Sequence, residues 1–589
     1  MSAAVQTVWA ELCVASLADA GVTELVVSPG SRSTPLVAAA AALPGLTLYP
    51  VIDERAAGFF ALGRARAGGA PVAVVCTSGT APAHYLPAVI EAAMSGVPLV
   101  VVSADRPPEL HGAGAAQTID QTRLFGGFVR RFEELGPADG SPLALRALRR
   151  KLGQAVAAAR GPAPGPVHVN VALRKPLEPA PPRTTAERAA AAEASRLRGV
   201  AVAAHAPFVR VPDDAIAAAA ALVAGARRGV ILATAGPASR RAARAAAFAL
   251  AARTGWPLLA EAGSQLRFAP RPGVAAVDRF ALAAAALAPD QRPDVIVQLG
   301  GEPAALGWAP LAAGARRVVL AEHGWPDGDS SALAVLVGDL ADTLDRLTAA
   351  LPPAPARAAD HAAAWRAADD AAARALAAAV AACAPPGAAA SEHAMVGAAI
   401  AAVPDGGQLV LGNSLPVRVA DEIAGGGRDL TVLTQRGAAG IDGLIAGAAG
   451  AAARGAPTVL VLGDVSFAHD VGALACARGL PLAIVVIDNG GGRIFDQLPV
   501  AAAALPAGSF ERLWRTPPAL DPVAAARAFG LAATLVRSPD ELGPAVAAAL
   551  AGAGPVLVHA PVAPASAAAV RAHAAAALAA PVPRHRSHA

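Results

Sequence analysis

An aspartate and an asparagine that each follow a strand-like apolar run are the most chemically informative residues of this 589-residue chain. Asp464 comes after residues 458–462, and Asn489 comes after residues 481–487, with a helix-compatible stretch between the two runs. Parallel strands joined by one crossover usually lie side by side, and open α/β sheets bind ligands at their carboxyl edge. A carboxylate, an amide oxygen and glycine-rich backbone are hard oxygen ligands. The segment therefore predicts a Mg²⁺ site held on a phosphate.

The same residues also have purely structural interpretations. Asp464 fits an ordinary turn, and Ser466 fits the cap of the following helix, which is compatible with a metal site. Glu54 follows a strand-like run and opens a helix-like stretch. A carboxylate flanked there by Asp53 and Arg55 favours a helix N-terminus without any catalytic role.

Strand-like runs alternate with helix-like stretches through three parts of the chain, and proline-rich linkers at 177–183 and 351–357 separate the parts. The first part has runs at 24–28, 47–52, 72–77, 98–103 and 167–171. The middle part has GVILATAG (229–236), PDVIVQLGG (293–301) and RRVVLAEHG (316–324), and the last has GQLVLGNS, LTVLTQRG, PTVLVLGD, PLAIVVIDN and GPVLVHA. Such alternation predicts an α/β fold of three tandem doubly wound parallel-sheet domains.

The predicted boundaries are residues 1–180 for the first domain, 195–350 for a central α/β domain and 358–562 for the last. An alanine-rich helix is expected from residue 358 to residue 382. The alanine-rich tail, 563–589, predicts a helix that we expect to be poorly ordered, because few contacts hold a chain terminus.

Composition excludes several classes of protein. Hydrophobic residues make up 55% of the chain, but alanine inflates that share, and no run resembles a membrane span. The N-terminus lacks the basic region of a signal peptide. The net charge of +4 comes from scattered arginines rather than a basic block, which argues against nucleic-acid binding. The four cysteines form no CxxC pair, which favours buried thiols in a reducing cytoplasm.

Six further motifs occur in order along the chain. They are VVSPGSRSTPL (26–36), VIDERAAGF (51–59), TSGTAPAHYLPAVIEA (77–92), SADRPPELHGAGAAQTIDQ (103–121), NSLPVR (413–418) and QRGAAGIDG (435–443). Together with the Asp464–Asn489 segment, they resemble the 2-succinyl-5-enolpyruvyl-6-hydroxy-3-cyclohexene-1-carboxylate (SEPHCHC) synthases of menaquinone biosynthesis, which are thiamine-diphosphate enzymes. Val465 and Asp488 depart from the commonest form of the diphosphate motif, which has glycine and asparagine there.

The resemblance implies a thiamine-diphosphate-binding fold in a pyruvate-oxidase-like arrangement. The first domain would bind the pyrimidine and the last the diphosphate. The implied activity is a transferase that decarboxylates 2-oxoglutarate and adds the resulting succinyl-semialdehyde carbanion equivalent to isochorismate, releasing CO₂. The implied cofactors are thiamine diphosphate and Mg²⁺, with Mn²⁺ as a substitute. The family also implies a cytoplasmic homodimer or homotetramer with active sites at the subunit interface.

The resemblance assigns cofactor roles residue by residue. Glu54 would be the catalytic carboxyl that faces the aminopyrimidine ring and exchanges a proton with it. Ile441 would hold the cofactor in a bent conformation, although packing in the hydrophobic core would also explain an isoleucine at this position. Metal ligands would be Asp464, Asn489 and the carbonyl of Gly491. Further cofactor contacts would come from Asn413, Ser414 and Ser466.

Substrate carboxylates favour arginine, because a guanidinium meets a carboxylate with two parallel hydrogen bonds. The motifs place the substrate-binding candidates at Ser31, Arg32, Arg106, Gln117, Arg418 and Arg436. Ile494, Phe495 and Leu498 would form an apolar wall for the isochorismate ring, with core packing of a helix as the alternative. Two departures from the family stand out. Ala116 replaces a usual asparagine, and residues 300–308 lack a basic residue that many relatives carry.

Three alternatives remain open from the sequence. Another thiamine-dependent decarboxylase or carboligase, such as an acetolactate synthase, shares the diphosphate motif, but the arginine set favours a dicarboxylate donor. A noncatalytic thiamine-fold protein should have lost Glu54 or a metal ligand, and the chain keeps them all. A nicotinamide dehydrogenase is disfavoured because no strand-like run is followed by GxGxxG.

Overall fold

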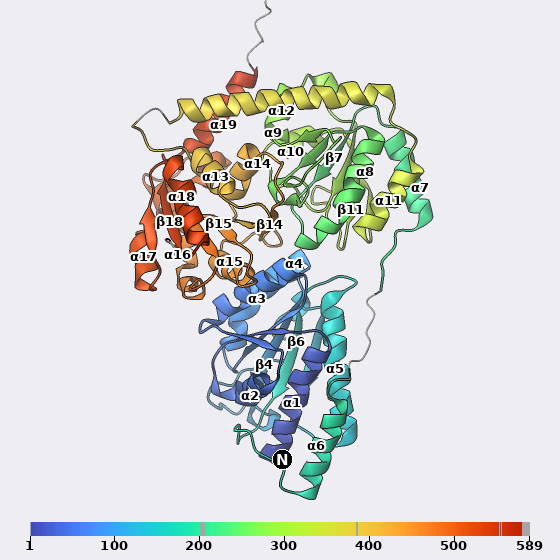
Figure 1. The fold of residues 1–589 in the computed structure, drawn as a ribbon, viewed down its shortest axis with the longest axis vertical. Helices are drawn as coiled ribbons and strands as arrows, with labels where there is room; N and C mark the ends of the chain where they lie inside the picture. The colour runs from blue at the N-terminus through green and yellow to red at the C-terminus, as the bar shows by residue number, and fades with distance from the viewer. Residues whose placement is uncertain (1, 201–206, 385–386, 553, 555, 580–589) are drawn as a thin grey trace, which may run out of the picture. The chain divides into compact units, whose positions relative to one another are not determined.

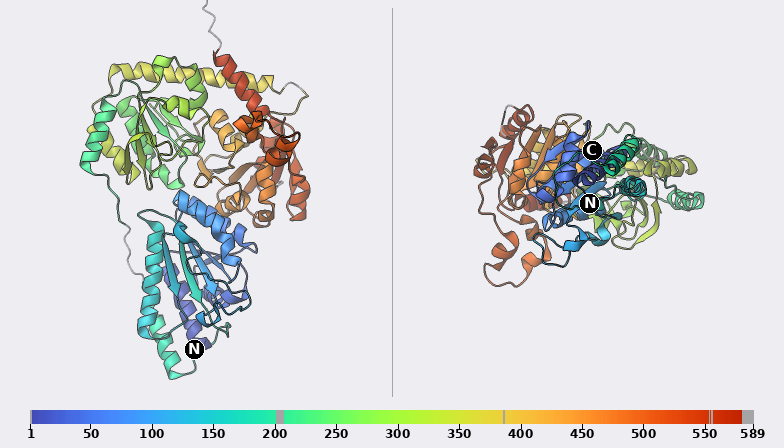
Figure 2. Two further views of the ribbon diagram at one scale, coloured as in Figure 1. Left: turned by 180° about the vertical axis from the view of Figure 1, so that it is seen from behind. Right: turned by 90° about the horizontal axis from the view of Figure 1, so that it is seen from below.

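Three parallel six-stranded sheets form the framework of the protein (Figure 1). The computed structural model describes residues 2–200, 207–384, 387–552, 554 and 556–579. Every strand pair in the three sheets is parallel, and helices lie on either side of each sheet (Figures 1 and 2). The predicted α/β class with three doubly wound parallel sheets is therefore confirmed.

The first sheet has the order β2-β1-β3-β4-β6-β5. Its strands are β1 (Glu24–Val27), β2 (Thr47–Pro50), β3 (Val72–Cys76), β4 (Leu99–Asp105), β5 (Arg131–Leu135) and β6 (Val167–Ala172). The helices that belong with it are α1 (Ala3–Asp19), α2 (Thr34–Ala42), α3 (Glu54–Gly68), α4 (Leu86–Ser95), α5 (Pro142–Arg160) and α6 (Thr185–Leu197).

The second sheet has the order β12-β11-β10-β7-β8-β9. Its strands are β7 (Gly229–Ala233), β8 (Leu258–Ala260), β9 (Ala276–Val277), β10 (Val295–Leu299), β11 (Arg316–Ala321) and β12 (Ala332–Val337). The helices in this part of the chain are α7 (Asp213–Ala224), α8 (Arg244–Thr254), α9 (Phe280–Ala286), α10 (Trp308–Ala312), α11 (Leu340–Ala350) and α12 (Ala356–Ala382).

The third sheet has the order β14-β13-β15-β16-β18-β17. Its strands are β13 (Gln408–Leu411), β14 (Thr431–Thr434), β15 (Thr458–Gly463), β16 (Leu482–Asp488), β17 (Ala533–Leu535) and β18 (Leu557–Pro561). The helices in this part are α13 (Glu392–Ala401), α14 (Leu415–Ile423), α15 (Leu444–Ala452), α16 (Asp464–His469), α17 (Pro522–Ala528), α18 (Pro539–Leu550) and α19 (Ser566–Ala579).

The chain forms two compact units that do not follow the order of the sequence. Unit 1 consists of Met1–Phe208, Gln435–Gly455 and Asp470–Leu480, and unit 2 of Val209–Thr434, Ala456–His469 and Pro481–Ala589. Unit 1 therefore contains the first sheet together with α15 from the C-terminal third of the chain. Unit 2 contains the second and third sheets.

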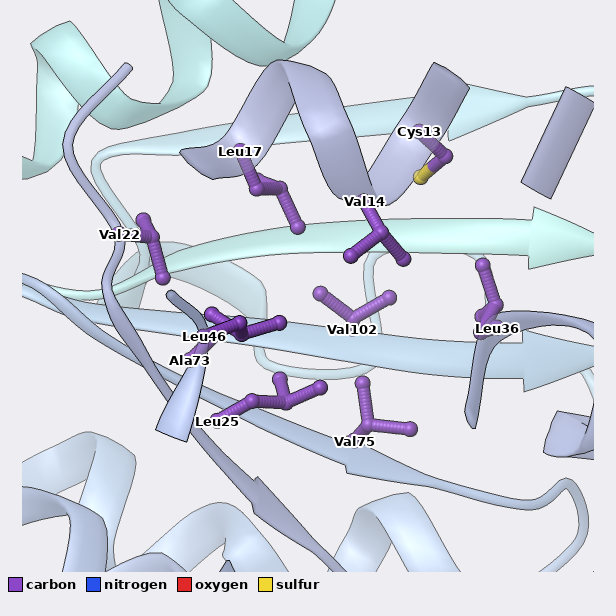
Figure 3. Close-up of a pocket in the computed structure, with 10 residues that line it drawn as sticks. All are labelled: Cys13, Val14, Leu17, Val22, Leu25, Leu36, Leu46, Ala73, Val75 and Val102. Atoms are coloured by element: carbon purple, nitrogen blue, oxygen red, sulfur yellow. The ribbon is translucent and has the colours of Figure 1, made fainter. Parts of the chain in front are cut away.

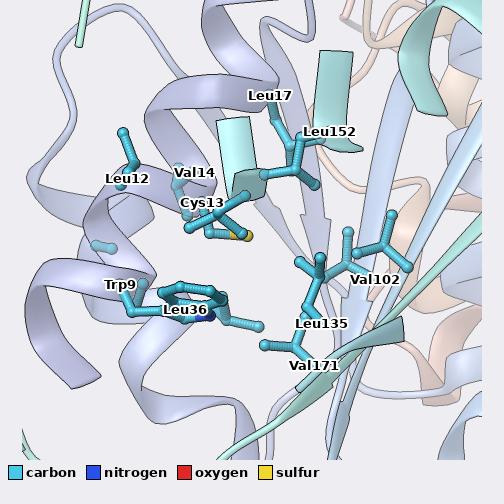
Figure 4. Close-up of a cluster of buried hydrophobic side chains, with 14 of the residues drawn as sticks. Trp9, Leu12, Cys13, Val14, Leu17, Leu36, Val102, Leu135, Leu152 and Val171 are labelled. Carbon is cyan, nitrogen blue, oxygen red and sulfur yellow. The ribbon is translucent and has the colours of Figure 1, made fainter. Parts of the chain in front are cut away.

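The core of unit 1 lies between its sheet and helices α1 and α5 (Figure 4). Trp9 and Leu12 of α1 are buried there with Leu152 of α5 and Val171 of β6. A small apolar cavity remains under α1, lined by Cys13, Val14 and Leu17 and by strand residues such as Val102 (Figure 3). Burial raises the pKa of Cys13 to about 12, so this thiol stays protonated and behaves as an apolar group.

The C-terminal tail differs in part from our expectation. Residues 566–579 form α19, whose Val570 and Ala574 are buried against the long helix α12 in unit 2 (Figure 1). The expectation of poor order is therefore wrong for this stretch, because alanine and valine on one helix face find an apolar partner. The last ten residues, 580–589, lie outside the described part of the chain.

No helix among the described residues is long and apolar enough to cross a membrane.

Candidate active site

The predicted metal edge forms where β15 and β16 end side by side. Gly463 of β15 pairs in register with Ile487 of β16, so Asp464 and Asn489 emerge from neighbouring strands. The backbone N–H of Gly491 donates to Asp464 Oδ2 at 2.7 Å, which ties the glycine turn to the carboxylate. Both polar side chains are buried, at 4% exposure for Asp464 and 6% for Asn489.

The donor set of this edge fits Mg²⁺. Asn489 Oδ1 is buried and has no hydrogen-bond partner among the described residues, so a hard amide oxygen is left for a cation. Burial, and next the charge of Asp488, raises the pKa of Asp464 to about 6. A cation bound at this carboxylate would offset both effects. The carbonyl of Gly491 accepts from the N–H of Arg493 at 2.8 Å in this structure.

Asp488, one of the two residues that depart from the diphosphate motif, is hydrogen-bonded to a histidine. His559 Nε2 lies 2.9 Å from Asp488 Oδ2, and this hydrogen bond lowers the pKa of Asp488. The carboxylate is thereby directed towards β18 of the same sheet. The replacement of asparagine by aspartate at this position is thus accommodated by a histidine.

Two turns beside the metal edge carry the remaining diphosphate candidates. Helix α16 begins at Asp464 itself, so Ser466 lies inside its first turn and does not cap it, contrary to the structural interpretation of that serine. Asn413 is buried in the turn between β13 and α14, and Ser414 follows with a φ of 72°. A positive φ in a residue other than glycine is strained and is concentrated at functional sites.

Glu54 is the first residue of α3, as the sequence predicts. The side chain of Asp53 caps this helix by accepting from the N–H of Arg55 at 2.9 Å, so Glu54 is not needed as the cap. Behind it, Tyr85 donates its hydroxyl to Ser28 Oγ at 2.9 Å in a fully buried site. Burial, and to a lesser extent the Glu54 charge, raises the pKa of Cys76 in the same region.

Helix α3 packs on α15 within unit 1, and small residues make the approach close. A Cβ atom on Gly450 would lie 2.1 Å from the carbonyl oxygen of Phe60. One on Gly443 would overlap the ring of Phe59. The contact fixes the helix that begins at Glu54 against the helix that follows Ile441, which is half-buried.

The loop before α15 is held by Glu91 of α4, a residue that the sequence analysis did not single out. Its carboxylate accepts from the N–H groups of Gly437 and Ala438, at 3.1 Å and 2.7 Å. It also accepts from Arg66 at 2.7 Å. Arg436, a substrate-binding candidate, is half-buried at the start of this loop. The signal in the sequence was a glutamate among apolar residues in the motif 77–92.

The structure brings Arg32 and Arg106 together at the carboxyl edge of the first sheet. Burial, and next the charge of Arg106, lowers the pKa of Arg32. Arg32 Nη1 donates to the carbonyl of Leu173 at 2.7 Å. Arg32 Nε and Arg106 Nη1 are buried without a hydrogen-bond partner among the described residues. Two clustered cations with spare donors form a site suited to a carboxylate. Ser31, on the same turn, is exposed.

Gln117 lies on an exposed turn beside the carboxyl edge of the first sheet, where Arg32 and Arg106 lie. Its Nε2 donates to the carbonyl of Ser78 at 3.0 Å, and its φ is 55°. Gln121 is the buried glutamine of the same motif and donates to Asn170 Oδ1 at 2.9 Å. The buried amide thus anchors the motif, while Gln117 stays at the surface. Ala116, beside it, is exposed.

Arg418 lies in unit 2 on α14, where its Nη1 donates to the carbonyl of Ser414 at 2.7 Å. A cleft in this unit is lined by Arg418, Asp421 and Glu422 of α14 together with Arg279 and Leu306 from the region of the second sheet. Leu306 belongs to the stretch that lacks the expected basic residue. Arg279, whose guanidinium pairs with Asp369 at 3.5 Å, lines the same cleft from a different element.

The predicted apolar wall lies on the short 3₁₀ segment Arg493–Gln497 that follows the metal edge. Ile494 packs in part against the core of the third sheet, and Phe495 is half-buried. Leu498 is 43% exposed. The core-packing alternative therefore applies in part to Ile494 but not to Leu498.

Comparison with known proteins identifies the family. Residues 8–124 match "Thiamine pyrophosphate enzyme, N-terminal TPP binding domain", and residues 425–560 match "Thiamine pyrophosphate enzyme, C-terminal TPP binding domain". A protein of Sorangium cellulosum named 2-succinyl-5-enolpyruvyl-6-hydroxy-3-cyclohexene-1-carboxylate synthase is 44% identical over 546 residues, which cover 89% of this chain and 87% of the relative. The chain belongs to the SEPHCHC synthase family.

Other members of the SEPHCHC synthase family are similarly close in length. The relative from Halobacterium salinarum is 40% identical, with 89% of this chain and 90% of the relative covered. The one from Geobacillus kaustophilus is 38% identical, with 89% of each chain covered. The predicted resemblance is confirmed, and with it a thiamine-diphosphate-dependent enzyme of the transferase type.

Solved structures confirm the fold at lower identity. A thiamine diphosphate-dependent 4-hydroxybenzoylformate decarboxylase from Rhodococcus jostii RHA1 superposes with a TM-score of 0.69 at 19% identity, covering 94% of this chain and 99% of that one. A benzoylformate decarboxylase from Polynucleobacter necessarius gives 0.68 at 17% identity, covering 94% and 98%. At these identities the likeness concerns the three-sheet architecture alone.

Within this member of the SEPHCHC synthase family, a buried charged network under the metal edge also escaped the sequence analysis. His393 Nε2 lies 2.7 Å from Glu422 Oε2, and Arg571 of α19 pairs with the same glutamate and with Gln497. Beside them Glu392 is fully buried, and burial raises the pKa of its carboxyl to about 7. Its position at a helix start after Ser391 predicts a cap, but not burial against a sheet edge.

Proposed function

We propose that this chain is a SEPHCHC synthase that joins 2-oxoglutarate to isochorismate with thiamine diphosphate and Mg²⁺ as cofactors. The C1–C2 bond of 2-oxoglutarate breaks and CO₂ leaves, while C2 forms a new bond to the isochorismate ring and one proton is taken up. The observation that carries the proposal is the 44% identity over 89% of the chain to a protein of that name. The retained Glu54, Asp464 and Asn489 support it.

The residues at the metal edge fit the proposed cofactor. Asp464, Asn489 Oδ1 and the Gly491 carbonyl would hold Mg²⁺, since all three are hard oxygen ligands. Asn413, Ser414 and Ser466 would contact the diphosphate. When bound, thiamine diphosphate supplies the electron sink for decarboxylation and the carbon nucleophile for the addition. Gly490 and Gly491 are both at positive φ, and a Cβ atom on Gly491 would lie 2.4 Å from the carbonyl oxygen of Arg515, so the turn at this edge needs glycine.

Glu54 is proposed to move the proton of the reaction. Because Asp53 already caps α3, the carboxyl of Glu54 is left for exchange with the aminopyrimidine ring. The packing of α3 on α15 holds this carboxyl on a rigid element, as proton transfer over hydrogen-bond distances requires. Ile441, in the loop before α15, would prop the cofactor.

The arginines are proposed to orient the two substrates by their carboxylates. Arg32 and Arg106 form one cationic site in unit 1, with Ser31 and Gln117 on adjacent turns. Arg418 and Arg279 line another in unit 2. Arg436 belongs to the loop that Glu91 holds in unit 1. Arg279 would contact a substrate carboxylate in place of the basic residue that is missing from residues 300–308. Ile494, Phe495 and Leu498 would exclude water from the isochorismate ring.

The assembly and the domain assignment are further parts of the proposal. We propose a cytoplasmic homodimer or homotetramer in which the pyrimidine-binding domain of one subunit and the diphosphate-binding domain of its partner complete each site. The proposed domains are 1–180, 195–350 and 358–562, with 563–589 as the tail. Gel filtration with light scattering would test the assembly.

The deciding experiment uses the purified full chain with thiamine diphosphate and Mg²⁺. We expect CO₂ release from 2-oxoglutarate and loss of the isochorismate absorbance, both dependent on the two cofactors. If CO₂ is released but isochorismate is not consumed, the cofactor class stands and the specific activity is wrong. Replacement of 2-oxoglutarate by pyruvate should abolish turnover, and full turnover with pyruvate would favour an acetolactate-synthase-like enzyme.

A further inference from the structure

The amide of Asn489 has two unlike ends, and only one of them can bind a metal. Its carbonyl oxygen is a ligand for Mg²⁺, whereas its NH₂ group is a donor that would repel a cation. An isolated amide can rotate by 180° at little cost because the two ends have nearly the same shape. A neighbouring group must therefore fix which end of the amide faces the metal edge.

The neighbour that fixes the orientation of the Asn489 amide is Glu392. Asn489 Nδ2 donates to Glu392 Oε2 at 3.1 Å, while Asn489 Oδ1 is buried with no hydrogen-bond partner among the described residues. An ionised carboxylate only accepts, so in that form Glu392 binds the NH₂ end and leaves the oxygen directed elsewhere, and a cation bound at the neighbouring Asp464 favours the ionised form. Because both side chains are buried, water does not compete for either amide end.

Glu392 is itself fixed in place by two elements. It is the first residue of α13, whose N-cap is Ser391, and its backbone N–H donates to Ser566 Oγ at 3.0 Å. Its other carboxylate oxygen, Oε1, is buried and unpartnered among the described residues. A buried acceptor with a spare oxygen is costly for stability alone. Its contact with a metal-ligand candidate offers a functional reason for keeping it.

We propose that Glu392 is a positioning residue that orients the Asn489 amide so that its oxygen is available to Mg²⁺. The inference rests on the metal site of the proposed function and extends it to a residue outside the ligand set. Partners that orient metal ligands typically change metal affinity by about 10–100-fold when they are removed. The effect should therefore appear in Mg²⁺ binding before any substrate is added.

The first test measures Mg²⁺ binding by calorimetry to the full chain at fixed thiamine diphosphate, without substrates. We expect Glu392→Leu to weaken Mg²⁺ binding by about 10–100-fold. The matched control is Glu261→Gln, which changes another fully buried glutamate of unit 2 whose contacts are backbone N–H groups away from this edge. The control should bind Mg²⁺ like the wild type. If Glu392→Leu binds within about twofold of the wild type, the inference is overturned.

The second test separates orientation from mere structural support by a pair of exchanges. Asn489→Asp places one carboxylate against another, so it should weaken Mg²⁺ binding despite the better ligand. In that background Glu392→Gln supplies an NH₂ donor to the new carboxylate at position 489 and should restore binding several-fold, whereas the same change in the wild type should weaken it or leave it unchanged. A purely structural role predicts that Glu392→Gln acts in the same direction in both backgrounds, and that outcome would refute the inference.

The two tests also separate this inference from the proposed activity. Circular dichroism checks folding. If Glu392→Leu does not fold, the comparison of Asn489→Asp with and without Glu392→Gln still tests the inference. A wild type that does not bind Mg²⁺ with thiamine diphosphate overturns the cofactor assignment and the inference together. A wild type that binds both but does not consume isochorismate overturns the activity and leaves the orientation of Asn489 as proposed.

Discussion

Gly63 of α3 faces Gly447 of α15 so closely that a Cβ atom on Gly63 would lie 1.9 Å from the Gly447 carbonyl oxygen. The obstacle is backbone, which cannot rotate aside as a side chain can. The two helices can therefore approach this closely only because residue 63 is a glycine. This contact lies within unit 1 and supports the helix that begins at Glu54.

Gly63→Ala should destabilise unit 1 by about 1–3 kcal/mol, because the added methyl group forces α3 and α15 apart. Urea unfolding of the full chain would measure the change. The matched control is Gly153→Ala in α5, where a Cβ atom meets nothing within 4 Å. That change should stabilise the protein by roughly 0.5–1 kcal/mol, because glycine is a poor helix former. Equal stability of the two variants would contradict the close approach.

Glu54→Gln should fold and bind thiamine diphosphate but lose about 10²–10⁴-fold in turnover, because glutamine cannot exchange a proton. Steady-state rates and cofactor binding by fluorescence quenching would be measured on the same preparation. Glu187→Gln is the control, since Glu187 is also a first-turn glutamate, in the capping box of α6. Near-normal turnover in Glu54→Gln would leave Glu54 as a helix-terminus charge only.

Arg279→Leu should raise the KM of one carboxylate substrate by about 10–100-fold, which corresponds to a charge-assisted hydrogen bond of about 1.5–3 kcal/mol. Michaelis–Menten kinetics with each substrate varied in turn would show which of the two contacts Arg279. Arg292→Leu, at an exposed arginine of the same part of the chain, should leave both KM values unchanged. Unchanged KM values in Arg279→Leu would mean that Arg279 does not replace the missing basic residue.

The stability of unit 2 should fall as pH rises from about 5 to 8, and Glu261 contributes to this fall together with Glu392 and Asp464, whose pKa values burial also raises. Burial, and next the charge of Asp421, raises the pKa of Glu261 from 4.5 to about 8. The folded state therefore holds a proton that the unfolded state releases, and this contribution is complete below pH 4.5 and lost as pH rises through 8. Thermal unfolding of the cofactor-free chain across this window would show the slope.

Glu261→Gln, which cannot titrate, should reduce that slope while lowering stability at acidic pH. The loss arises because glutamine offers one oxygen to the backbone N–H groups of Ala235, Ala304 and Ala305, which use both oxygens of the glutamate. A slope as steep as that of the wild type would assign the pH dependence to another group.

The long buried strands were predictable from the sequence, and so were the edge strands β2 and β14, but β5, β8, β9, β12 and β17 were missed. β15 and β16 are continuous apolar runs because helices cover both faces of a parallel sheet. β5 has the letters RFEEL and lies at a sheet edge, where charge protects against unwanted pairing and hides the strand pattern. β8, β9 and β17 have two or three residues each, too few for a periodicity to show.

The ligand candidates could be placed from motifs, but their supports could not. Asp464 and Asn489 follow strands, and the pairing of neighbouring strands decides that they meet. Glu91 and Glu392 act through contacts to residues 346 and 97 positions away. Apolar neighbours can mark such a glutamate as buried, as they do for Glu91, but nothing local in the sequence identifies its partners, because the tertiary fold sets them.

The interleaved path of unit 1 has a consequence for how the protein is made. Its first 208 residues contain a whole sheet, yet the helix that covers the glycine face of α3 comes from Gln435–Gly455. A ribosome must therefore synthesise all of the second sheet and part of the third before unit 1 can close. Until then the ring of Phe59 and the face of α3 that meets α15 lack their partner. The first domain to emerge is thus among the last to be completed, and its α3 face stays open to aggregation until α15 has been synthesised.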